Sequence, residues 1–198
     1  MKIVLATANP GKQRELAALL GPLGHELVLA SAWGIDSAPE TGTTFEANAL
    51  LKARHAARRA ALPALADDSG LEVDALGGRP GVYSARYAGV GASDQDNNAR
   101  LLAELMGRPR QQRAARYRCV LALVRGFDDP APLLARGSWE GHIAIAAAGS
   151  GGFGYDPLFV PEDYRHTVAE LPEMLKHQLS HRARAAAELV ALLRAGAL

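Results

Sequence analysis

A single phenylalanine, Phe153, stands among glycines in the segment 149–157. Glycine allows a backbone to approach a ligand closely and to adopt positive φ angles at little cost. A lone aromatic ring in such a loop offers a flat face for stacking, and the following Asp156-Pro157 pair places a polar group in a stiff frame. The same residues also fit a hairpin anchored by a buried phenylalanine. The phosphate-type and carboxylate segments elsewhere in the chain favour the stacking interpretation.

A turn between a predicted strand and a predicted helix has the residue types of a phosphate site. In order, its residues are Thr7, Ala8, Asn9, Pro10, Gly11 and Lys12. Asn9 is a good N-cap and Pro10 suits the first helical position, so the helix begins here with a positive dipole end beside Lys12. Such a terminus suits a phosphate. The spacing is not that of a P-loop, and an ordinary capped turn with a solvent-facing lysine is the alternative.

Two segments place carboxylates beside glycines, namely 40–42 and 67–70. Mg²⁺ takes one or two carboxylates and completes its shell with water and phosphate oxygens, so Glu40 and Asp68 are candidate Mg²⁺ ligands. Asp68 can alternatively, or additionally, take a proton from an attacking water. Consecutive side chains diverge on an extended backbone, so only one of Asp67 and Asp68 is expected to point into a site. Ordinary turn chemistry with solvated aspartates is the alternative.

Further cations lie on two predicted helices. Lys52 comes four residues after Asn48 on one helical face and can add positive charge near a polyphosphate. Lys176 and the segment 180–182, Ser-His-Arg, lie at the head of the last helix, where the dipole disfavours cations and a ligand is therefore more plausible. Lys176 and Arg182 only donate hydrogen bonds, which favours a carbonyl on a base over an amino group. A surface lysine and a basic helix start without a ligand are the alternatives.

The composition argues against several classes of protein. The chain has 198 residues, of which 48% are hydrophobic and 22% charged, and its net charge is +1. A near-neutral chain is a poor partner for a nucleic-acid polymer, because binding to the phosphate backbone usually needs a basic surface. The sequence contains no motif of a zinc site or of a serine hydrolase. It also contains no apolar run of transmembrane or signal-peptide length, so we expect a soluble cytoplasmic protein with no membrane partner.

Two further sequence features receive structural interpretations. The sole cysteine, Cys119, lies in an apolar run and is expected to be a buried, reduced thiol. A cluster of arginines with little aromatic interleaving is expected to form a solvated basic edge. Its members are Arg108, Arg110, Arg113, Arg116 and Arg118.

The order of the predicted elements indicates an α/β fold. Strands are expected at 3–6 and 27–29, with an amphipathic helix between them that ends near Gly21. A second helix is expected from a capping box at Thr43 and Glu46 to about Ala61. Short strands at 64–66 and 71–73 are expected to flank a turn at 67–70. The remaining prediction is a helix at 93–106, antiparallel-type strands at 117–124, 133–139 and 142–146, and a last helix at 180–194. Helices are expected to cover the sheet on both faces.

In this order, the segments resemble the inosine triphosphate pyrophosphatase family, and most closely its bacterial XTP/dITP diphosphatases of the RdgB type. The likeness covers nearly the whole chain, and the motifs are specific as a set although each is modest. The matching stretches are Leu5-Ala6-Thr7-x-Asn9-x-Gly11-Lys12, Glu40-Thr41-Gly42-x-Thr44-Phe45, Asn48-Ala49-x-x-Lys52-Ala53, Ala66-Asp67-Asp68-Ser69-Gly70-Leu71, Pro80-Gly81-x-Tyr83-Ser84-Ala85-Arg86-Tyr87, Gly152-Phe153-Gly154-Tyr155-Asp156-Pro157 and Ser180-His181-Arg182.

The resemblance implies a fold, a reaction and a cofactor. The implied fold is a single elongated α/β domain over residues 1–198, in which helices flank a long mixed β-sheet. This domain has two lobes, with a nucleotide cleft between them. The implied protein is a homodimer that needs Mg²⁺. It hydrolyses non-standard purine nucleotides such as ITP, dITP and XTP to the monophosphate and pyrophosphate, which cleanses the nucleotide pool.

The resemblance also assigns roles by position. The turn 7–12 and Lys52 would hold the triphosphate, and Glu40 and Asp68 would hold the metal, with Asp68 as general base. Phe153 would stack on the base, Asp156 would help to fix the nucleoside and Ser69 would touch the substrate. The substrate-binding set also includes Gly154 and Tyr155. Lys176, His181 and Arg182 would read the 6-keto edge of the base.

Three positions depart from the family pattern. Ala8 stands where glycine is usual, Ala47 where glutamate is usual and Ala183 where glycine is usual. Because Ala47 replaces the glutamate, a metal or dimer role of that glutamate has no support in this chain.

Rival functions would fit parts of the sequence. A Maf-like pyrophosphatase acting on dTTP or UTP would share the phosphate end without the Ser-His-Arg segment. A nucleotide-binding sensor would not need both carboxylates, and an RNA-binding module is disfavoured by the net charge.

Overall fold

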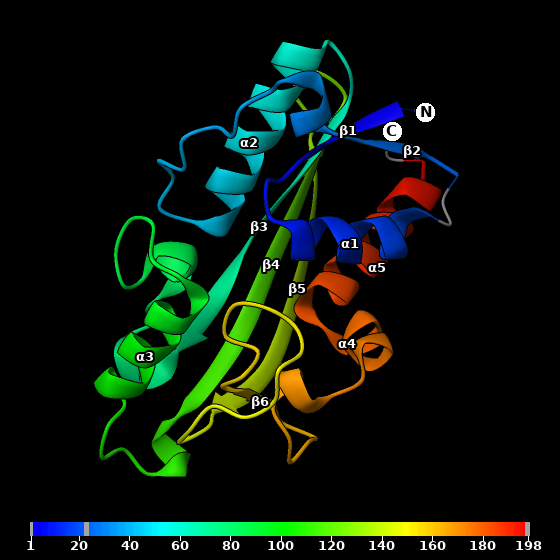
Figure 1. The fold of residues 1–198 in the computed structure, drawn as a ribbon. Helices are drawn as coiled ribbons and strands as arrows, with labels where there is room; N and C mark the ends of the chain where they lie inside the picture. Colours follow the sequence, from blue (N-terminus) through cyan, green and yellow to red (C-terminus); the bar gives the residue numbers. More distant parts are fainter. Residues whose placement is uncertain (1, 22–23, 197–198) are drawn as a thin grey trace. The chain divides into compact units, whose positions relative to one another are not determined.

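The computed structural model describes residues 2–21 and 24–196 and contains a six-stranded sheet flanked by helices (Figure 1). The strands are β1 (Lys2–Ala6), β2 (Glu26–Leu29), β3 (Ala64–Val73), β4 (Ala114–Val124), β5 (Leu133–Ile143) and β6 (Phe159–Pro161). The α-helices are α1 (Pro10–Leu20), α2 (Phe45–Ala60), α3 (Asp94–Glu104), α4 (Glu173–Leu179) and α5 (His181–Arg194). The strand order is β2-β1-β3-β4-β5-β6; β1 is parallel to β2 and β3, whereas β5 and β6 are antiparallel. The expected α/β fold with a mixed sheet is confirmed.

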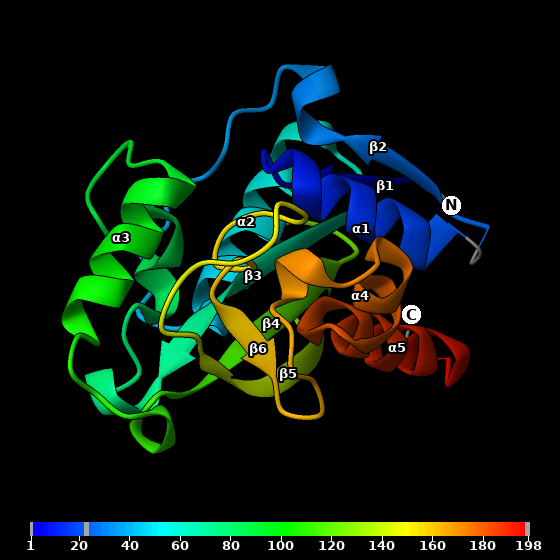
Figure 2. The same cartoon turned by 60° about the horizontal axis from the view of Figure 1, so that its bottom comes forward.

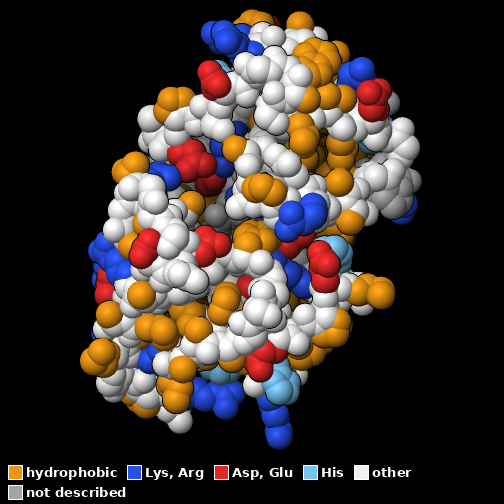
Figure 3. Space-filling view, in the orientation of Figure 1, with side chains coloured by type: hydrophobic (Ala, Val, Ile, Leu, Met, Phe, Trp, Pro, Cys, Tyr) orange, Lys and Arg blue, Asp and Glu red, His pale blue; other side chains and the backbone are white. Residues whose placement is uncertain are grey.

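The chain divides into two compact units, each assembled from separate stretches of sequence. Unit 1 comprises Met1–Asp68, Cys119–Gly137 and His181–Leu198, and unit 2 comprises Ser69–Arg118 and Ser138–Ser180. The chain therefore passes between the units within the strands β3, β4 and β5 and again between α4 and α5, and the sequence shows no linker at these points. None of the helices in the described part of the chain is both long and apolar enough to cross a membrane. Acidic and basic side chains are intermixed on the face that Figure 3 shows.

Unit 1 buries both faces of its strands because their side chains alternate between two apolar clusters. Ile3 and Leu5 of β1 pack with α1 and α5, whereas Val4 packs with α2. In β4, Leu121 joins the first of these clusters and Val120 the second. Successive side chains of a strand point to opposite faces, so a strand that is covered on both faces is apolar throughout. Figures 1 and 2 show α1 beside α5 on one face of these strands and α2 on the other.

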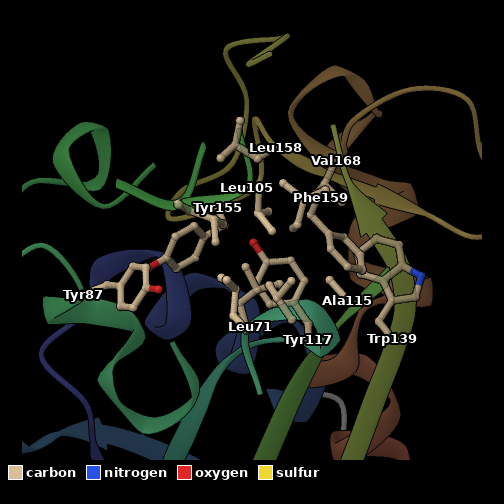
Figure 4. Packing of buried hydrophobic residues seen from close by; sticks show 14 residues of the cluster. Leu71, Tyr87, Leu105, Ala115, Tyr117, Trp139, Tyr155, Leu158, Phe159 and Val168 are labelled. Carbon is tan, nitrogen blue, oxygen red and sulfur yellow. The ribbon is translucent and has the colours of Figure 1, made fainter. Parts of the chain in front are cut away.

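Unit 2 buries one face of its strands and leaves the other face polar. The buried face carries an aromatic cluster in which the Phe159 ring lies between Tyr117 and Trp139, with centroids 4.6 Å and 5.8 Å away (Figure 4). Arg116 and Arg118 alternate with the inward residues of β4, and their side chains form ion pairs with Asp74, Glu140 and Glu72. This half of β4 therefore has the alternating pattern of a strand with one solvent-exposed face.

The structure corrects two predictions about strands. Residues 67–70 do not form a turn, because β3 runs without interruption from Ala64 to Val73 as an interior strand of the sheet. Instead of two strands at 133–139 and 142–146, one strand, β5, continues through Gly141 and ends at Ile143, so residues 144–146 lie outside it. A Cβ on Gly141 would collide with the Val160 carbonyl of β6, so this glycine allows a close approach of backbones rather than a chain reversal. The short β6 and α4 were not predicted.

Two further predictions were wrong in detail. The N-cap of α2 is Thr44, whose side chain accepts from the Ala47 N–H at 3.1 Å, so Thr43 and Glu46 do not form the expected capping box. Arg113 is not part of a solvated basic edge, because it is buried and its guanidinium donates to the carbonyls of Ile143, Leu105 and Ala144.

Candidate active site

The turn between β1 and α1 is ordered by its own side chains. The Asn9 Oδ1 atom accepts from the Lys12 N–H at 3.1 Å, which caps α1, and the Thr7 Oγ1 atom accepts from the Asn9 N–H at 3.3 Å. The Gln13 side chain donates to the Thr7 carbonyl at 2.8 Å. The predicted N-cap and the proline in the first turn are confirmed, and this first turn carries no acidic residue. The positive end of the helix dipole is therefore not offset by the helix itself and suits an anion.

Lys52 joins the two predicted metal ligands of unit 1. Its Nζ atom lies 2.9 Å from Glu40 Oε1 and 2.5 Å from Asp68 Oδ1. The loop that carries Glu40 is held against α2 by Asn48, whose Oδ1 atom accepts from the Gly42 N–H at 2.8 Å. Asn48 and Lys52 lie four residues apart on one face of α2. The sequence predicted these two residues on a common face, and the structure adds that one holds the loop and the other binds its carboxylate.

Asp68 has the properties of a carboxylate that can accept a proton. Burial raises the pKa of Asp68, and the neighbouring Lys52 and Lys12 oppose that shift. The Lys52 pKa is also raised, because the attraction of Asp68 and Glu40 outweighs the effect of burial, so Lys52 stays charged. The Asp68 Oδ2 atom is buried and has no hydrogen-bond partner within the described residues. A buried carboxylate oxygen without a donor can receive a proton or bind a cation.

Asp67 lies on the opposite face of β3 and belongs to a buried charge cluster in unit 1. Its carboxylate pairs with Lys12 through Oδ1 and with the Arg182 Nε atom at 2.9 Å through Oδ2. Arg182 also pairs with Glu15, and the Cys119 thiol lies 3.1 Å from Asp67 Oδ2. Burial alone would raise the pKa of Asp67, but Arg182 and Lys12 hold it well below its usual range. The expected burial of Cys119 is confirmed, and burial followed by the Asp67 charge raises the pKa of its thiol well above the ordinary value.

The glycine-rich loop of unit 2 folds around Asp156. The Asp156 Oδ2 atom accepts from the Phe153 N–H at 2.9 Å and from Lys176 Nζ at 2.6 Å. The Lys176 Nζ atom also lies 4.1 Å from the centroid of the half-buried Phe153 ring, within cation–π distance. Gly152 has a φ of +73°, and a Cβ there would collide with Asp156 Oδ2. The loop therefore needs glycine at position 152 and brings together three of the predicted base-contacting residues.

The remaining predicted residues of unit 1 have varied exposure. In the turn 7–12, Ala8 and Pro10 are exposed and Gly11 is buried. His181 is buried in the first turn of α5, and its carbonyl lies so close to Gly137 of β5 that no side chain fits at that position.

The other predicted residues of unit 2 are partly or fully buried. Ser69 is half-buried in β3. Tyr155 is buried, and its hydroxyl donates to the Ser84 carbonyl at 2.8 Å, which anchors this side chain in the core. The Gly154 N–H donates to Asp94 Oδ2 at 2.6 Å, so the loop is also attached to the first turn of α3.

Two residues of these clusters were missed by the sequence reasoning. Glu15 is a carboxylate on the apolar face of α1, directly before the fully buried Leu16, and this break in the hydrophobic pattern was a usable signal. Tyr117 donates to Asp156 Oδ1 at 3.1 Å. A tyrosine on the inward face of a strand is common, so the sequence held no signal for this contact.

Comparisons with known proteins give matches along nearly the whole chain. The model of the Ham1 family matches residues 3–192. A dITP/XTP pyrophosphatase of Methylococcus capsulatus is 57% identical over 194 residues, which cover 98% of this chain and 96% of the relative. One of Yersinia pseudotuberculosis is 56% identical over 184 residues, which cover 93% of both. The solved structure of a HAM1 protein from Coxiella burnetii has a TM-score of 0.91 at 43% identity and covers 98% of both chains. The Staphylococcus aureus Ham1 protein has a TM-score of 0.87 at 37% identity and covers 99% of this chain and 100% of its own. With matches of this length and identity, the chain belongs to the Ham1 family.

Proposed function

We propose that this protein is a nucleoside triphosphate pyrophosphohydrolase that converts dITP, XTP and ITP to the monophosphate and pyrophosphate. The observation that carries the proposal is the near-full-length match to relatives named dITP/XTP pyrophosphatase, at 57% and 56% identity. The chemistry of the site agrees with this reaction, because unit 1 combines an anion-binding helix start with a lysine–carboxylate cluster. Unit 2 supplies an aromatic ring beside a hydrogen-bond donor, which are the groups that a purine base requires.

The triphosphate end of the substrate would be bound by unit 1. The capped start of α1 provides N–H groups and a positive dipole end, and Lys12 and Lys52 provide charge. Lys52 pairs with the carboxylates of Glu40 and Asp68, whereas Lys12 pairs with Asp67 on the opposite face of β3. A lysine that stabilises the negative charge of the departing pyrophosphate lowers the barrier to its release.

We assign a Mg²⁺ ion to Glu40 and Asp68. The residues fit the ion, because two carboxylates share one cation here and the buried Asp68 Oδ2 atom has no donor among the described residues. The described part of the chain offers no cluster of three or more histidine, cysteine or acidic side chains for a metal. A site with only two carboxylates suits Mg²⁺, which keeps several waters and binds substrate phosphates. When bound, the ion would neutralise charge that develops on the phosphate oxygens.

Asp68 would act as the general base. The reaction is an in-line attack of water on the α-phosphorus, in which the water loses a proton as the new P–O bond forms and the bond to the pyrophosphate breaks. The raised pKa of Asp68 makes its carboxylate a better proton acceptor than an ordinary aspartate. Lys52, held at 2.5 Å, keeps the carboxylate oriented until substrate binds.

Selectivity would come from the base end. The base would stack on Phe153, with Asp156 fixing the nucleoside and with Ser69, Gly154 and Tyr155 in the same binding set. Lys176, His181 and Arg182 would supply donors to the 6-keto oxygen. A 6-amino purine would place a donor against these donors, and such a mismatch of buried polar groups can reduce kcat/KM by orders of magnitude.

The test is a substrate panel with separate measurement of pyrophosphate and orthophosphate. The wild-type protein with Mg²⁺ is expected to release pyrophosphate from ITP, XTP and dITP and to spare ATP, whose 6-amino group would face the donors. Pyrophosphate mainly from dTTP or UTP would replace the proposal with a Maf-like activity. Tight binding of nucleotides without release of either product would replace it with a sensor.

We further propose that the protein is a homodimer and acts in the cytoplasm, where the nucleotide pool lies. Both proposals rest on the likeness to the family. Light scattering of the purified protein is expected to give twice the chain mass of 20.9 kDa. A mass equal to that of one chain would contradict the dimer.

A further inference from the structure

Asp156 is the centre of the unit 2 cluster and accepts hydrogen bonds from the glycine-rich loop, from α4 and from β4. Its Oδ2 atom accepts from the Phe153 N–H at 2.9 Å and from Lys176 Nζ at 2.6 Å, and its Oδ1 atom accepts from the Tyr117 hydroxyl at 3.1 Å. The carboxylate is almost fully buried, with 2% of its residue surface exposed. Hydrogen bonds to a buried carboxylate are strong and directional. The position of Asp156 is therefore set by the loop, by α4 and by β4 together.

The Asp156 carboxylate helps to hold the ammonium group of Lys176 in place. A lysine side chain is a flexible four-carbon stem that ends in a compact charge, so it takes a single position only when a partner holds it. Here the ammonium group is buried, bonded to Asp156 and placed 4.1 Å from the Phe153 centroid. The same Asp156 oxygen accepts from the Phe153 backbone, so one oxygen sets both the ring and the cation beside it.

Tyr117 is the member of the cluster that comes from the rigid core. It lies on β4 with its ring against Phe159, inside the aromatic cluster of unit 2 (Figure 4). Tyr117, Asp156 and Lys176 are all buried, with 7%, 2% and 5% of their residue surface exposed, whereas Phe153 is half-buried. The Tyr117 hydroxyl thus connects the predicted base-contacting groups of the loop and α4 to β4.

We propose that Tyr117 is a positioning residue for base recognition, which acts through Asp156 on Lys176 and Phe153. This inference rests on the proposed function, because it concerns how the same site selects a 6-keto purine. Lysine can only donate, so its contribution to selectivity depends on where its ammonium group is held. Without the Tyr117 hydroxyl, the Asp156 carboxylate loses the bond at Oδ1 and keeps those at Oδ2, so its broad terminal torsion, and with it the position of Lys176, is less closely confined.

The first experiment compares Tyr117→Phe with wild type on ITP and ATP. The substitution removes one oxygen and leaves the ring packing in place. We expect the KM for ITP to rise about 5-fold with little change in kcat, because one neutral donor to the carboxylate is lost. The ratio of kcat/KM for ITP over ATP should fall by a similar factor. The matched control is Tyr87→Phe, which removes a hydroxyl from another buried tyrosine of the same cluster, beside Glu104 and outside the Asp156 network.

A double-mutant cycle separates positioning from a merely structural role. If Tyr117 acts through Lys176, its effect should nearly vanish in a Lys176→Met background, since coupled sites are not additive. There, Tyr117→Phe should change the ratio of kcat/KM for ITP over ATP by less than about 1.5-fold. Unchanged selectivity in Tyr117→Phe, or the same change in Tyr87→Phe, would overturn the inference. So would a full effect of Tyr117→Phe in the Lys176→Met background.

Product binding distinguishes a failure of this inference from a failure of the proposed function. The affinities for IMP and AMP, measured by calorimetry, need no turnover. A wild-type protein that does not cleave ITP contradicts the proposed function, yet a preference for IMP that falls about 5-fold in Tyr117→Phe still supports the inference. A preference for IMP that is absent in wild type, or that Tyr117→Phe leaves unchanged, contradicts the inference whatever the turnover.

Discussion

Replacing Lys52 with methionine tests whether this lysine holds the two carboxylates of unit 1 together. Methionine has a similar length and no charge, so the variant leaves Asp68 and Glu40 next to each other without the shared cation. The side chains of Lys52, Asp68 and Glu40 are 11%, 7% and 29% exposed, so solvent screens the loss only in part. We therefore expect a loss of folding stability and a higher pKa for Asp68.

The magnitude follows from the distances. At an effective dielectric constant of about 20, the contact of 2.5 Å to Asp68 is worth about 7 kcal/mol before the ions are desolvated. Desolvation offsets most of this attraction, and removal of one partner of a buried pair costs about 3–5 kcal/mol. Because Glu40 is partly exposed, we expect Lys52→Met to lower the free energy of unfolding by about 3 kcal/mol at pH 7.5.

The loss should depend on pH with a definite sign. Burial raises the pKa of Asp68 above its unfolded value, so the folded state binds a proton more readily than the unfolded state and loses stability as pH rises through this range. Without Lys52 the pKa rises further. A larger share of Asp68 is then protonated in the variant at pH 4.5 than at pH 7.5, so the loss of stability should shrink, to about 1 kcal/mol.

The assay is urea unfolding at pH 7.5 and pH 4.5, followed by circular dichroism. The control is Lys2→Met, which breaks an exposed ion pair with Glu26 at 3.3 Å in the same unit and should cost less than about 0.5 kcal/mol at either pH. An equal loss at both pH values for Lys52→Met would refute the reasoning, because it would show that repulsion between charged carboxylates is not the cause. A loss no larger than that of Lys2→Met would refute the burial argument as well.

The remaining predictions concern catalysis, selectivity and the metal. Asp68→Asn should lower kcat by about 10²–10⁴-fold with an unchanged circular dichroism spectrum, and full turnover would exclude the general base role. Arg182→Met should destabilise the fold by about 3–5 kcal/mol, because it leaves Asp67 buried without one of its cations. The variant should also lower the ratio of kcat/KM for ITP over ATP, and an unchanged ratio would count against a role of Arg182 in reading the base. Gly152→Ala should raise the KM for ITP, since its Cβ would collide with Asp156, whereas Gly91→Ala has the same positive φ in open space and should affect stability alone. Dialysis against EDTA should abolish pyrophosphate release and added Mg²⁺ should restore it; turnover that persists in EDTA would contradict the metal assignment.

Local features of the site were predictable from the sequence because they depend on neighbouring residues. The cap by Asn9 and the helix start at Pro10 follow from the preferences of these residue types and are confirmed. The divergence of Asp67 and Asp68 follows from the alternation of side chains on a strand, and it holds although the predicted turn at 67–70 is a strand. Pattern reasoning failed at β3 and β5, where glycines that looked like turn signals lie inside strands. Neighbouring strands overrode the local preference there.

The partners of the charged groups could not be predicted, because they come from distant parts of the chain. Asp67 and Arg182 are 115 residues apart in sequence, and Tyr117 and Asp156 are 39 apart, yet each pair forms a hydrogen bond. A single sequence shows that a carboxylate or a lysine is present, and its periodicity shows on which face it lies. It carries no signal for the distant residue opposite, since strand order and helix packing set that choice. The types of chemistry therefore follow from the residues, whereas the pairing of Lys52 with Glu40 and Asp68, and of Lys176 with Asp156, follows from the way the folded chain brings them into contact.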